Sequence, residues 1–388
     1  MPRGVVVLGL VSLCMDVSSE MIHALLPLYL ATGLGVSMLG IGLLEGAAEA
    51  LALIVKVFSG VWSDVLRRRK PLILAGYGLA ALTKPVFALA PSLGWIVSAR
   101  LADRLGKGMR GAPRDALIAD LTPRAVHGAS FGLRQALDTV GALLGPVIAI
   151  AALVVFAGDF RAAFWIAVVP AFLAVALIVF GVDEPDRPTS ATPPKRLALS
   201  DARRLPRAFW LVTGVAALMA VARCSEAFLV LRAVDVGLVV AQAPWVMVAM
   251  TLVYAIVAYP AGAALDRGRG RPMLYAGLAA LGAAHASLAF AQGSPLLVAG
   301  AMLWGLHMGL TQGVFAALVA AHAPSDLRGS AFGVFNLAQG AAMLVASGAA
   351  GALWDAFGAR AAFAFGAAFA LVAALALAAS GGALARAK

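Results

Sequence analysis

The chain has 388 residues, of which 62% are hydrophobic and only 13% are charged. So little polar surface cannot cover a soluble globule, which excludes soluble proteins and predicts a polytopic membrane protein. The net charge of +11 does not indicate a nucleic-acid partner, because most Lys and Arg residues lie in short loops between apolar segments.

Twelve segments are long and apolar enough to cross a bilayer. We expect these spans at residues 5–31, 38–62, 71–91, 94–120, 128–156, 160–181, 208–232, 241–264, 272–291, 294–321, 330–354 and 360–380. The stretch 182–207 is rich in Pro and charge, which is typical of a linker. The expected fold is an all-α membrane protein of two six-helix halves, residues 1–181 and 208–388, joined by a cytoplasmic linker at 182–207.

Basic residues in the loops predict the orientation of the chain. One set of alternate loops holds eighteen Lys and Arg residues, and the other holds three, Arg161, Arg232 and Arg360. By the positive-inside rule, both termini and the linker are expected in the cytoplasm, with the protein in the inner cell membrane. The two cysteines, Cys14 and Cys224, lie in separate apolar segments and predict neither a disulfide framework nor a metal site. No cofactor is expected.

An internal repeat supports the division into two halves. The loop from Gly60 to Pro71 recurs from Gly262 to Pro272, and the stretch from Pro123 to Leu133 recurs from Pro324 to Val334. The offsets are nearly equal, about 202 and 201 residues, and parallel repeated halves are a common plan of transporters.

The twelve spans, the basic linker and the motif G-x-x-x-D-x-x-R-R-R-K at Gly60 to Lys70 together resemble the major facilitator superfamily. The resemblance covers the whole chain and implies a transporter, which we expect to be a monomer. It also implies that the loop motif is a conformational latch, in which the glycine permits close helix approach and the aspartate caps a neighbouring helix. The alternative is an ordinary basic turn. The residues carried over are Gly60, Asp64 and Arg68, with Gly262, Asp266 and Arg267 in the second copy.

Span 5 contains Gly141, Gly145 and Pro146, which resemble the G-x-x-x-G-P signature of drug:proton antiporters, although the further glycine of that signature is missing. The glycines allow a neighbouring helix to pack closely and the proline bends the helix, so packing alone is the alternative. Span 4 resembles the R-x-x-Q-G signature of the same subgroup through Arg104 and Lys107, with Lys in place of Gln.

Span 4 carries seven formal charges between Arg100 and Asp115. On a helix these residues fall within an arc of roughly 140°. Because a charge at mid-bilayer is costly, one charged face predicts a helix that lines a polar cavity. A solvated amphipathic helix is the alternative.

Spans 1, 2, 4 and 5 place acids and bases at one depth, estimated from the rise of 1.5 Å per residue. A carboxylate held near Arg or Lys can exchange a proton when water access changes sides, so we predict a proton-coupling site there. Buried salt bridges that stabilise one state are the alternative. The predicted proton-coupling residues are Asp16, Glu20, Glu49, Arg104, Lys107 and Asp138.

The C-terminal half has far fewer charges and offers aromatic, thioether and amide groups at membrane depth. We therefore predict that it forms the wall for an organic substrate, although many of these side chains will only pack. The predicted substrate-binding residues of the two halves are His23, Arg100, Arg110, Phe228, Trp304, His307, Gln312 and Asn336.

These patterns favour a secondary active transporter, a proton-coupled exporter of a small amphipathic organic compound. The alternative is proton-coupled uptake of a small organic anion. A third reading is metal or chelate transport through Cys14, Asp16 and His23, but the ligands lie only partly on one face. The sequence contains no P-loop, no Ser-His-Asp arrangement and no H-E-x-x-H motif, so we do not expect an enzyme.

Overall fold

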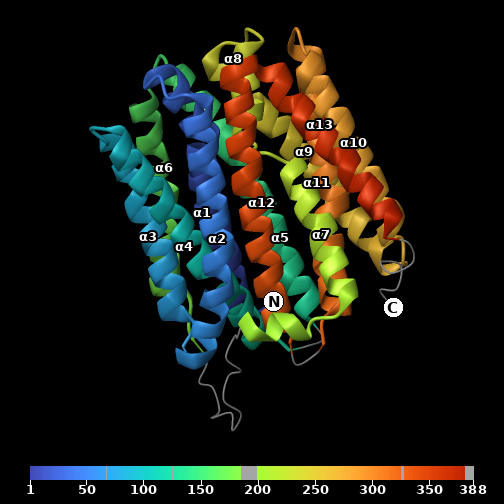
Figure 1. Cartoon of the computed structure of the whole chain (residues 1–388). Helices are drawn as coiled ribbons and strands as arrows, with labels where there is room; N and C mark the ends of the chain where they lie inside the picture. Colours follow the sequence, from blue (N-terminus) through green and yellow to red (C-terminus); the bar gives the residue numbers. More distant parts are fainter. Residues whose placement is uncertain (67, 124–125, 185–198, 325–326, 381–388) are drawn as a thin grey trace. The chain divides into compact units, whose positions relative to one another are not determined.

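The computed structural model describes residues 1–66, 68–123, 126–184, 199–324 and 327–380. These residues fold into long helices connected by short loops (Figure 1). The elements are α1 (Arg3–Leu28), η1 (Tyr29–Gly33), α2 (Met38–Leu66), α3 (Lys70–Leu89), α4 (Leu93–Asp120), α5 (His127–Val155), α6 (Phe160–Gly181), η3 (Leu199–Arg204), α7 (Arg207–Ala222), α8 (Ala227–Asp235), η4 (Val240–Gln242), α9 (Trp245–Asp266), α10 (Gly270–Phe290), α11 (Ser294–His322), α12 (Arg328–Phe357) and α13 (Ala359–Ala379).

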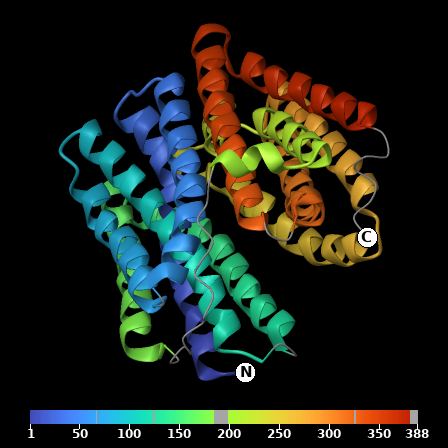
Figure 2. The same cartoon turned by 60° about the horizontal axis from the view of Figure 1, so that its bottom comes forward.

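The helices form twelve membrane spans in two six-helix halves, which confirms the predicted fold class. Eleven stretches of the described residues are long and apolar enough to cross a bilayer, and one of them, Arg207–Asp235, combines α7 with α8. The twelfth span is α4, which has the required length of 28 residues but carries the charged stretch of the sequence. Figures 1 and 2 show the helices as up-and-down bundles.

The seventh span, predicted at residues 208–232, is present but consists of two helices. α7 ends at Ala222 and α8 begins at Ala227. The side chain of Ser225 accepts a hydrogen bond from the Ala227 amide at 3.3 Å, and its own amide donates to Ser347 Oγ of α12 at 3.1 Å. His285 Nε2 of α10 donates to the Ala222 carbonyl at 2.8 Å. The break is therefore stable in the bilayer because polar groups of other helices satisfy its backbone.

The chain divides into two compact units. The N-terminal unit comprises residues 1–26 and 51–196, and the C-terminal unit comprises residues 27–50 and 197–388. The end of α1 and the first half of α2 thus belong to the C-terminal unit. The predicted boundary at 182–207 stays a prediction, because residues 185–198 lie outside the described part of the chain.

The core of the N-terminal unit is formed by α1, α3, α4 and α6. Its apolar side chains include Val5, Leu8, Val11, Met15, Ile73, Tyr77, Ala80, Leu117, Ile118, Ala171, Ala174 and Ile178. α3 and α4 come into backbone contact, because a Cβ on Gly106 would lie 2.5 Å from the carbonyl oxygen of Gly76. This contact brings the charged α4 against the apolar α3 and fixes the level of its side chains.

The core of the C-terminal unit contains a similar close approach at Gly366 of α13. A Cβ at this position would lie 2.1 Å from Cε1 of His285. The His285 ring cannot move aside, because it bonds to Ala222 and lies against Trp304 with 5.2 Å between ring centroids. The glycine is therefore required by the packing of α10 against α13.

We expect Gly366→Ala to lower the free energy of unfolding by about 1–3 kcal/mol, the usual cost of overpacking. Gly282→Ala on α10 is the control, because nothing lies within 4 Å of a Cβ there. Thermal unfolding in detergent measures both variants. Equal midpoints for the two would contradict the packing described above.

Candidate functional site

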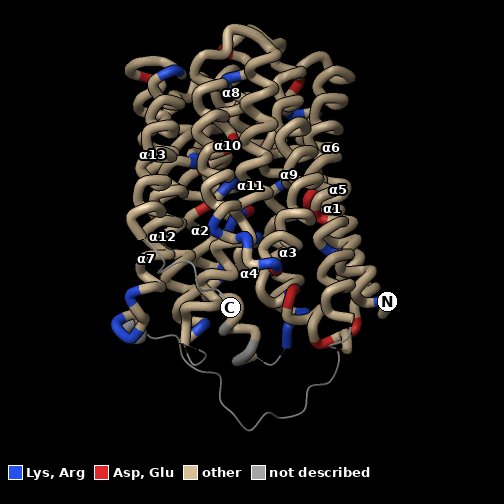
Figure 3. The backbone as a smooth tube through the Cα atoms, turned by 90° about the vertical axis from the view of Figure 1, so that its right-hand side faces the viewer, with Lys and Arg blue, Asp and Glu red and all other residues tan. Residues whose placement is uncertain are grey.

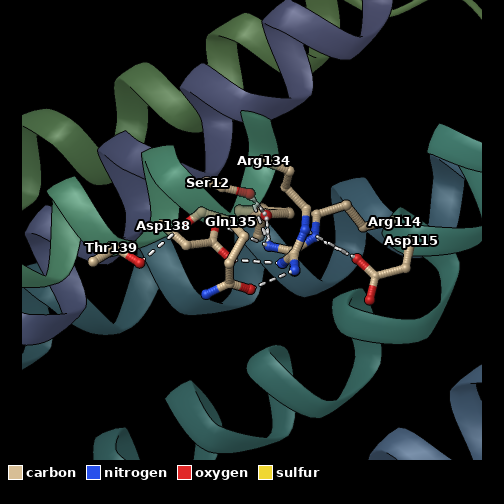
Figure 4. A network of polar contacts seen from close by, with 8 residues as sticks. Ser12, Arg114, Asp115, Arg134, Gln135, Asp138 and Thr139 are labelled. Atoms are coloured by element: carbon tan, nitrogen blue, oxygen red, sulfur yellow. Dashed lines mark hydrogen bonds and ion pairs between the residues drawn. The ribbon is translucent and has the colours of Figure 1, made fainter. Parts of the chain in front are cut away.

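The candidate site lies inside the N-terminal unit, where two arginines and two aspartates of α4 and α5 form an ionic network. Arg114 and Asp115 come from α4, and Arg134 and Asp138 come from α5. Figure 4 shows the two arginines turned toward each other, with Asp138 and Asp115 on opposite sides. We call these four residues the arginine–aspartate network. Figure 3 shows that charged positions also occur along the helices, not only at their ends.

Asp138 is the carboxylate with two basic partners in the arginine–aspartate network. Arg134 Nη1 lies 2.5 Å from Asp138 Oδ2, one helical turn away, and Arg114 Nη1 lies 3.8 Å from Asp138 Oδ1. The side chain of Asp138 is only 15% exposed. Because few water molecules reach it, the ionised form of this carboxylate is stabilised mainly by its ion pairs with the two arginines.

Each arginine also has a second partner. Arg134 Nε lies 3.7 Å from Asp115 Oδ1, and Arg134 Nη2 donates to Gln135 Oε1 at 2.9 Å. Arg114 Nη1 donates to Ser12 Oγ of α1 at 2.8 Å and to the Tyr77 hydroxyl of α3 at 3.3 Å. The arginines could therefore keep hydrogen bonds if Asp138 became neutral. Asp115 has a side chain that is 38% exposed, so the network reaches an accessible surface.

Two glycines of α5 bring α1 against the same site. A Cβ on Gly141 would lie 3.0 Å from Cβ of Asp16, and a Cβ on Gly145 would lie 2.6 Å from Cβ of Glu20. Any larger residue at these positions would push α1 away. The glycines of the sequence signature thus set the acids of α1 beside the helix that carries Asp138.

The other acids predicted to take part in proton coupling have different surroundings. Glu20 Oε2 lies 3.3 Å from Nδ1 of His23, also on α1. Glu49 is half-buried and belongs to the C-terminal unit. Of the predicted basic partners, Arg104 is buried and Lys107 is exposed. The ion pairs of Asp138 go instead to Arg134 and Arg114.

A second charged cluster of the N-terminal unit is fully buried. Lys84 Nζ of α3 lies 2.8 Å from Asp103 Oδ1 of α4, and the side chains are 0% and 4% exposed. Lys84 also donates to Ser19 Oγ of α1 at 3.3 Å, and Arg100 lies 4.0 Å from Asp103. This pair joins three helices. With so little exposure, we interpret it as a structural tie and not as a site of proton exchange.

Arg100 and Arg110, predicted to bind substrate, are buried within the N-terminal unit. Arg100 is 0% exposed, and Arg110 lies over the ring of Tyr77 with 4.6 Å between its guanidinium carbon and the ring centroid. Their predicted role stays a prediction. In the structure Arg100 lies near Asp103 and Arg110 lies over Tyr77.

In the C-terminal unit, three of the predicted substrate residues are buried and two are accessible. Phe228 packs on Trp354, Trp304 packs on His285, and His307 Nδ1 donates to the Gly277 carbonyl at 2.9 Å. Gln312 is exposed and Asn336 is half-buried. Gln312 is therefore the better placed of the five to meet a ligand.

A pocket of about 200 Å³ contains Gln312 and is formed by α9, α10 and α11. The described lining residues are all uncharged. They are Tyr254, Ala258, Ala261, Gly262, Leu265, Met273, Met308, Gly309, Leu310, Gln312, Gly313 and Val314. Two methionines and one amide suit a mainly apolar ligand with a single hydrogen-bonding group.

The predicted latch residues are only partly described. A Cβ on Gly60 would lie 3.4 Å from Ala112 Cβ, so α2 and α4 are in contact there, whereas nothing lies within 4 Å at Gly262. The side chain of Asp64 lies outside the described residues. Arg68, Asp266 and Arg267 are exposed, and Pro146 is buried in α5. The latch function stays a prediction.

The predicted site residues did not include Arg114, Asp115, Arg134 or Lys84, although all four are charged positions of the first five predicted spans. The spacing of Arg134 and Asp138 by four residues was a usable signal, because such residues are neighbours on a helix. Lys84 gave no signal of its own, since a single Lys in an apolar segment does not reveal its partner. Among the described residues, no three His, Cys, Asp or Glu side chains converge as metal ligands would.

Several known proteins are similar to this chain. The family model of the Major Facilitator Superfamily matches residues 8–234 and 225–381. An uncharacterized MFS-type transporter of Methanocaldococcus jannaschii is 30% identical over 359 residues, which cover 91% of this chain and 88% of that protein. The quinolone resistance protein NorA of Staphylococcus aureus is 30% identical over 123 residues, 32% of this chain and 31% of NorA. The crystal structure of a POT family transporter in complex with 5-aminolevulinic acid has a TM-score of 0.82 at 14% identity, covering 100% of this chain and 97% of that one.

We expect Lys84→Met to lower the free energy of unfolding by about 3–5 kcal/mol, because it removes the closest partner of the buried Asp103. Thermal or denaturant unfolding in detergent measures the loss. Asp103→Asn should cost less in the Lys84→Met protein than in the native one, because the uncompensated charge is then already present. Additive effects of the two changes would refute a direct coupling of the pair.

Proposed function

Because the chain belongs to the major facilitator superfamily, we propose that this multi-pass membrane transporter is a proton-coupled exporter of a small amphipathic organic compound. The observation that carries the proposal is the pairing of Asp138 with both Arg134 and Arg114. The partial likeness to a quinolone resistance protein supports export. A monomer in the inner membrane, with both termini in the cytoplasm, is part of the proposal.

The arginine–aspartate network offers a physical route for coupling. While Asp138 is ionised, both arginines are drawn to it. When Asp138 takes up a proton this attraction is lost, so Arg134 is free to turn to Asp115, and Arg114 keeps its bonds to Ser12 and Tyr77. Because Ser12 and Tyr77 belong to α1 and α3, protonation of one carboxylate changes the forces among four helices.

The lining of the pocket in the C-terminal unit supports the proposal that the substrate has an apolar group. Its uncharged lining would accept an aromatic or aliphatic group, and Gln312 would supply one hydrogen bond. An amphipathic compound with a small apolar part fits this chemistry better than a compound charged at every end. Proton-coupled uptake of a small organic anion is the competing function, and it would use the same carboxylate with the opposite direction of substrate movement.

We expect Asp138→Asn to reduce the rate of proton-driven ethidium efflux from proteoliposomes by about tenfold or more. This corresponds to an activation free energy that is higher by about 1.4 kcal/mol or more. Exchange of ethidium at equal concentrations needs no proton cycle and should continue. Asp159→Asn is the matched control, because Asp159 caps α6 by accepting the amides of Arg161 and Ala162, and the amide oxygen of Asn can accept the same bonds.

Normal proton-driven efflux by Asp138→Asn would refute this role of the carboxylate. Proton-dependent accumulation of a small organic anion, with no effect of the proton gradient on ethidium, would favour uptake instead.

Filling the pocket tests the substrate site separately. Gly313→Val and Gly262→Val add bulk where nothing lies within 4 Å of a Cβ, so the fold should tolerate them. We expect the KM for ethidium to rise by roughly tenfold or more, as when a ligand loses its place in an apolar pocket. Gly282→Val makes the same change at an equally open position outside the pocket. If all three variants transport alike, the pocket does not bind this substrate.

A further inference from the structure

A groove of about 480 Å³ runs along the exposed side of α7, within the C-terminal unit. Figure 2 shows α7, in lime, between α12 and α13, both in red. Nothing lies within 4 Å of a Cβ at Gly214, so the missing side chain of this glycine leaves the surface of α7 open there. We call this feature the α7 groove. Its lining includes Trp210, Leu211, Gly214, Leu218 and Val221 of α7 and Ala376 of α13.

The lining of the α7 groove is apolar. Apart from the indole N–H of Trp210, none of the described lining residues carries a polar side-chain group. A helix face that borders a water-filled path through a membrane protein normally carries polar or ionisable groups. Lipid tails are as apolar as leucine side chains, so they are the natural neighbours of such a lining. The α7 groove is therefore suited to a hydrocarbon chain.

The length of the α7 groove matches one leaflet of a bilayer. From Trp210 to Val221 the helix rises by about 16 Å, at 1.5 Å per residue. The hydrocarbon core of a bilayer is about 30 Å thick, so one leaflet accounts for about 15 Å. Trp210, Gly214, Leu218 and Val221 follow each other at intervals of three or four residues and share one face of the helix. One acyl chain could thus lie along the whole groove.

The end of the α7 groove at Trp210 is positively charged. Arg203 belongs to the last turn of η3, and Arg207 is the first residue of α7, three positions before Trp210 on the same face. Both arginines are exposed, and within the described part of the chain no carboxylate forms an ion pair with either of them. Figure 3 shows Lys and Arg positions gathered below the label of α7. The sequence from Leu199 to Trp210 contains three Arg and one Asp.

We propose that the α7 groove binds an anionic phospholipid, with one acyl chain in the groove and the phosphate between Arg203 and Arg207. A guanidinium group can bind two phosphate oxygens at once, and basic pockets beside membrane spans recognise anionic headgroups. Trp210 lies between the charged and the apolar part, which is the place that Trp prefers at a membrane interface. The proposal does not rest on the proposed export.

The charge of this surface also argues against a second copy of the chain as the occupant. Two copies that meet through the same face of α7 in one membrane would bring the same arginines together at the same end. Like charges that face each other across an interface are unfavourable. An anionic lipid instead supplies the opposite charge.

Native mass spectrometry of the detergent-purified protein tests the proposal, with dioleoyl phosphatidylglycerol and dioleoyl phosphatidylcholine as probes. The two lipids have the same acyl chains, and only the first has a net negative charge. We expect the apparent Kd for the first bound phosphatidylglycerol to be about tenfold lower than that for phosphatidylcholine, because each arginine near the headgroup attracts anionic lipid. The double variant Arg203→Gln and Arg207→Gln should bring the two Kd values together.

The matched control is the double variant Arg269→Gln and Arg271→Gln. It removes the same charge from the connection between α9 and α10, which lies at the same end of the C-terminal unit as the start of α7. Neither residue lines the α7 groove. The preference for phosphatidylglycerol should be unchanged in this variant.

Filling the α7 groove tests the place of the acyl chain. Gly214→Leu adds bulk where there is open space, and Leu is a better helix former than Gly, so the fold should tolerate it. We expect the Kd values for both lipids to rise by roughly tenfold, as when a ligand loses its place in an apolar pocket. Gly282→Leu makes the same change at an open position outside the groove and should leave both Kd values unchanged.

Equal Kd values for the two lipids in the native protein would overturn the proposal. A preference that survives in Arg203→Gln and Arg207→Gln, or that the control pair loses as well, would do the same. A dimer that Gly214→Leu abolishes without an effect on lipid binding would show that the groove binds a second copy. If Gly214→Leu does not fold, the arginine variants decide. These measurements involve no transport, so failure of the export proposal would not affect them.

Discussion

A charge inside a membrane span needs a partner, and this requirement determines how the N-terminal unit is built. The unit meets it in two ways. Lys84 and Asp103 neutralise each other out of contact with solvent, and a pair of this kind is costly to separate. In the arginine–aspartate network each arginine has a further hydrogen-bonding partner besides Asp138, and the network reaches an accessible surface through Asp115. The first arrangement ties helices together, whereas the second can rearrange, and this difference in exposure separates a structural role from a coupling role.

The two halves share a repeat but use it differently. In the first half, Ser59 Oγ donates to the Gly108 carbonyl at 2.9 Å, and Gly60 lies close to Ala112, so α2 and α4 stay in contact. In the second half, α9 and α11 meet closely at Gly305, but Gly262 has open space beside it. The space is the uncharged pocket. One helical frame thus supports a charged interior in one unit and a cavity in the other.

Hydropathy was enough to predict the spans other than α4, because span length and apolar composition follow directly from the bilayer. It could not predict the break at Arg223 to Glu226, because its ends are satisfied by His285 and Ser347, which are distant in the sequence. The depth estimate identified Asp138 but assigned it to Arg104 and Lys107. Rise per residue ignores helix tilt, and only the three-dimensional packing places Arg114 beside Asp138.

The sequence also could not predict which side chains of α11 are buried. α11 is apolar on most sides, so no periodicity indicates that Trp304 and His307 face the interior while Gln312 faces outward. The same limit applies to Asp355, which looks like an ordinary acid at a helix end. Its carboxylate accepts hydrogen bonds from the backbone amides of Met38 and Leu39 at the start of α2. These residues are so distant in the sequence that no local pattern could reveal the contact.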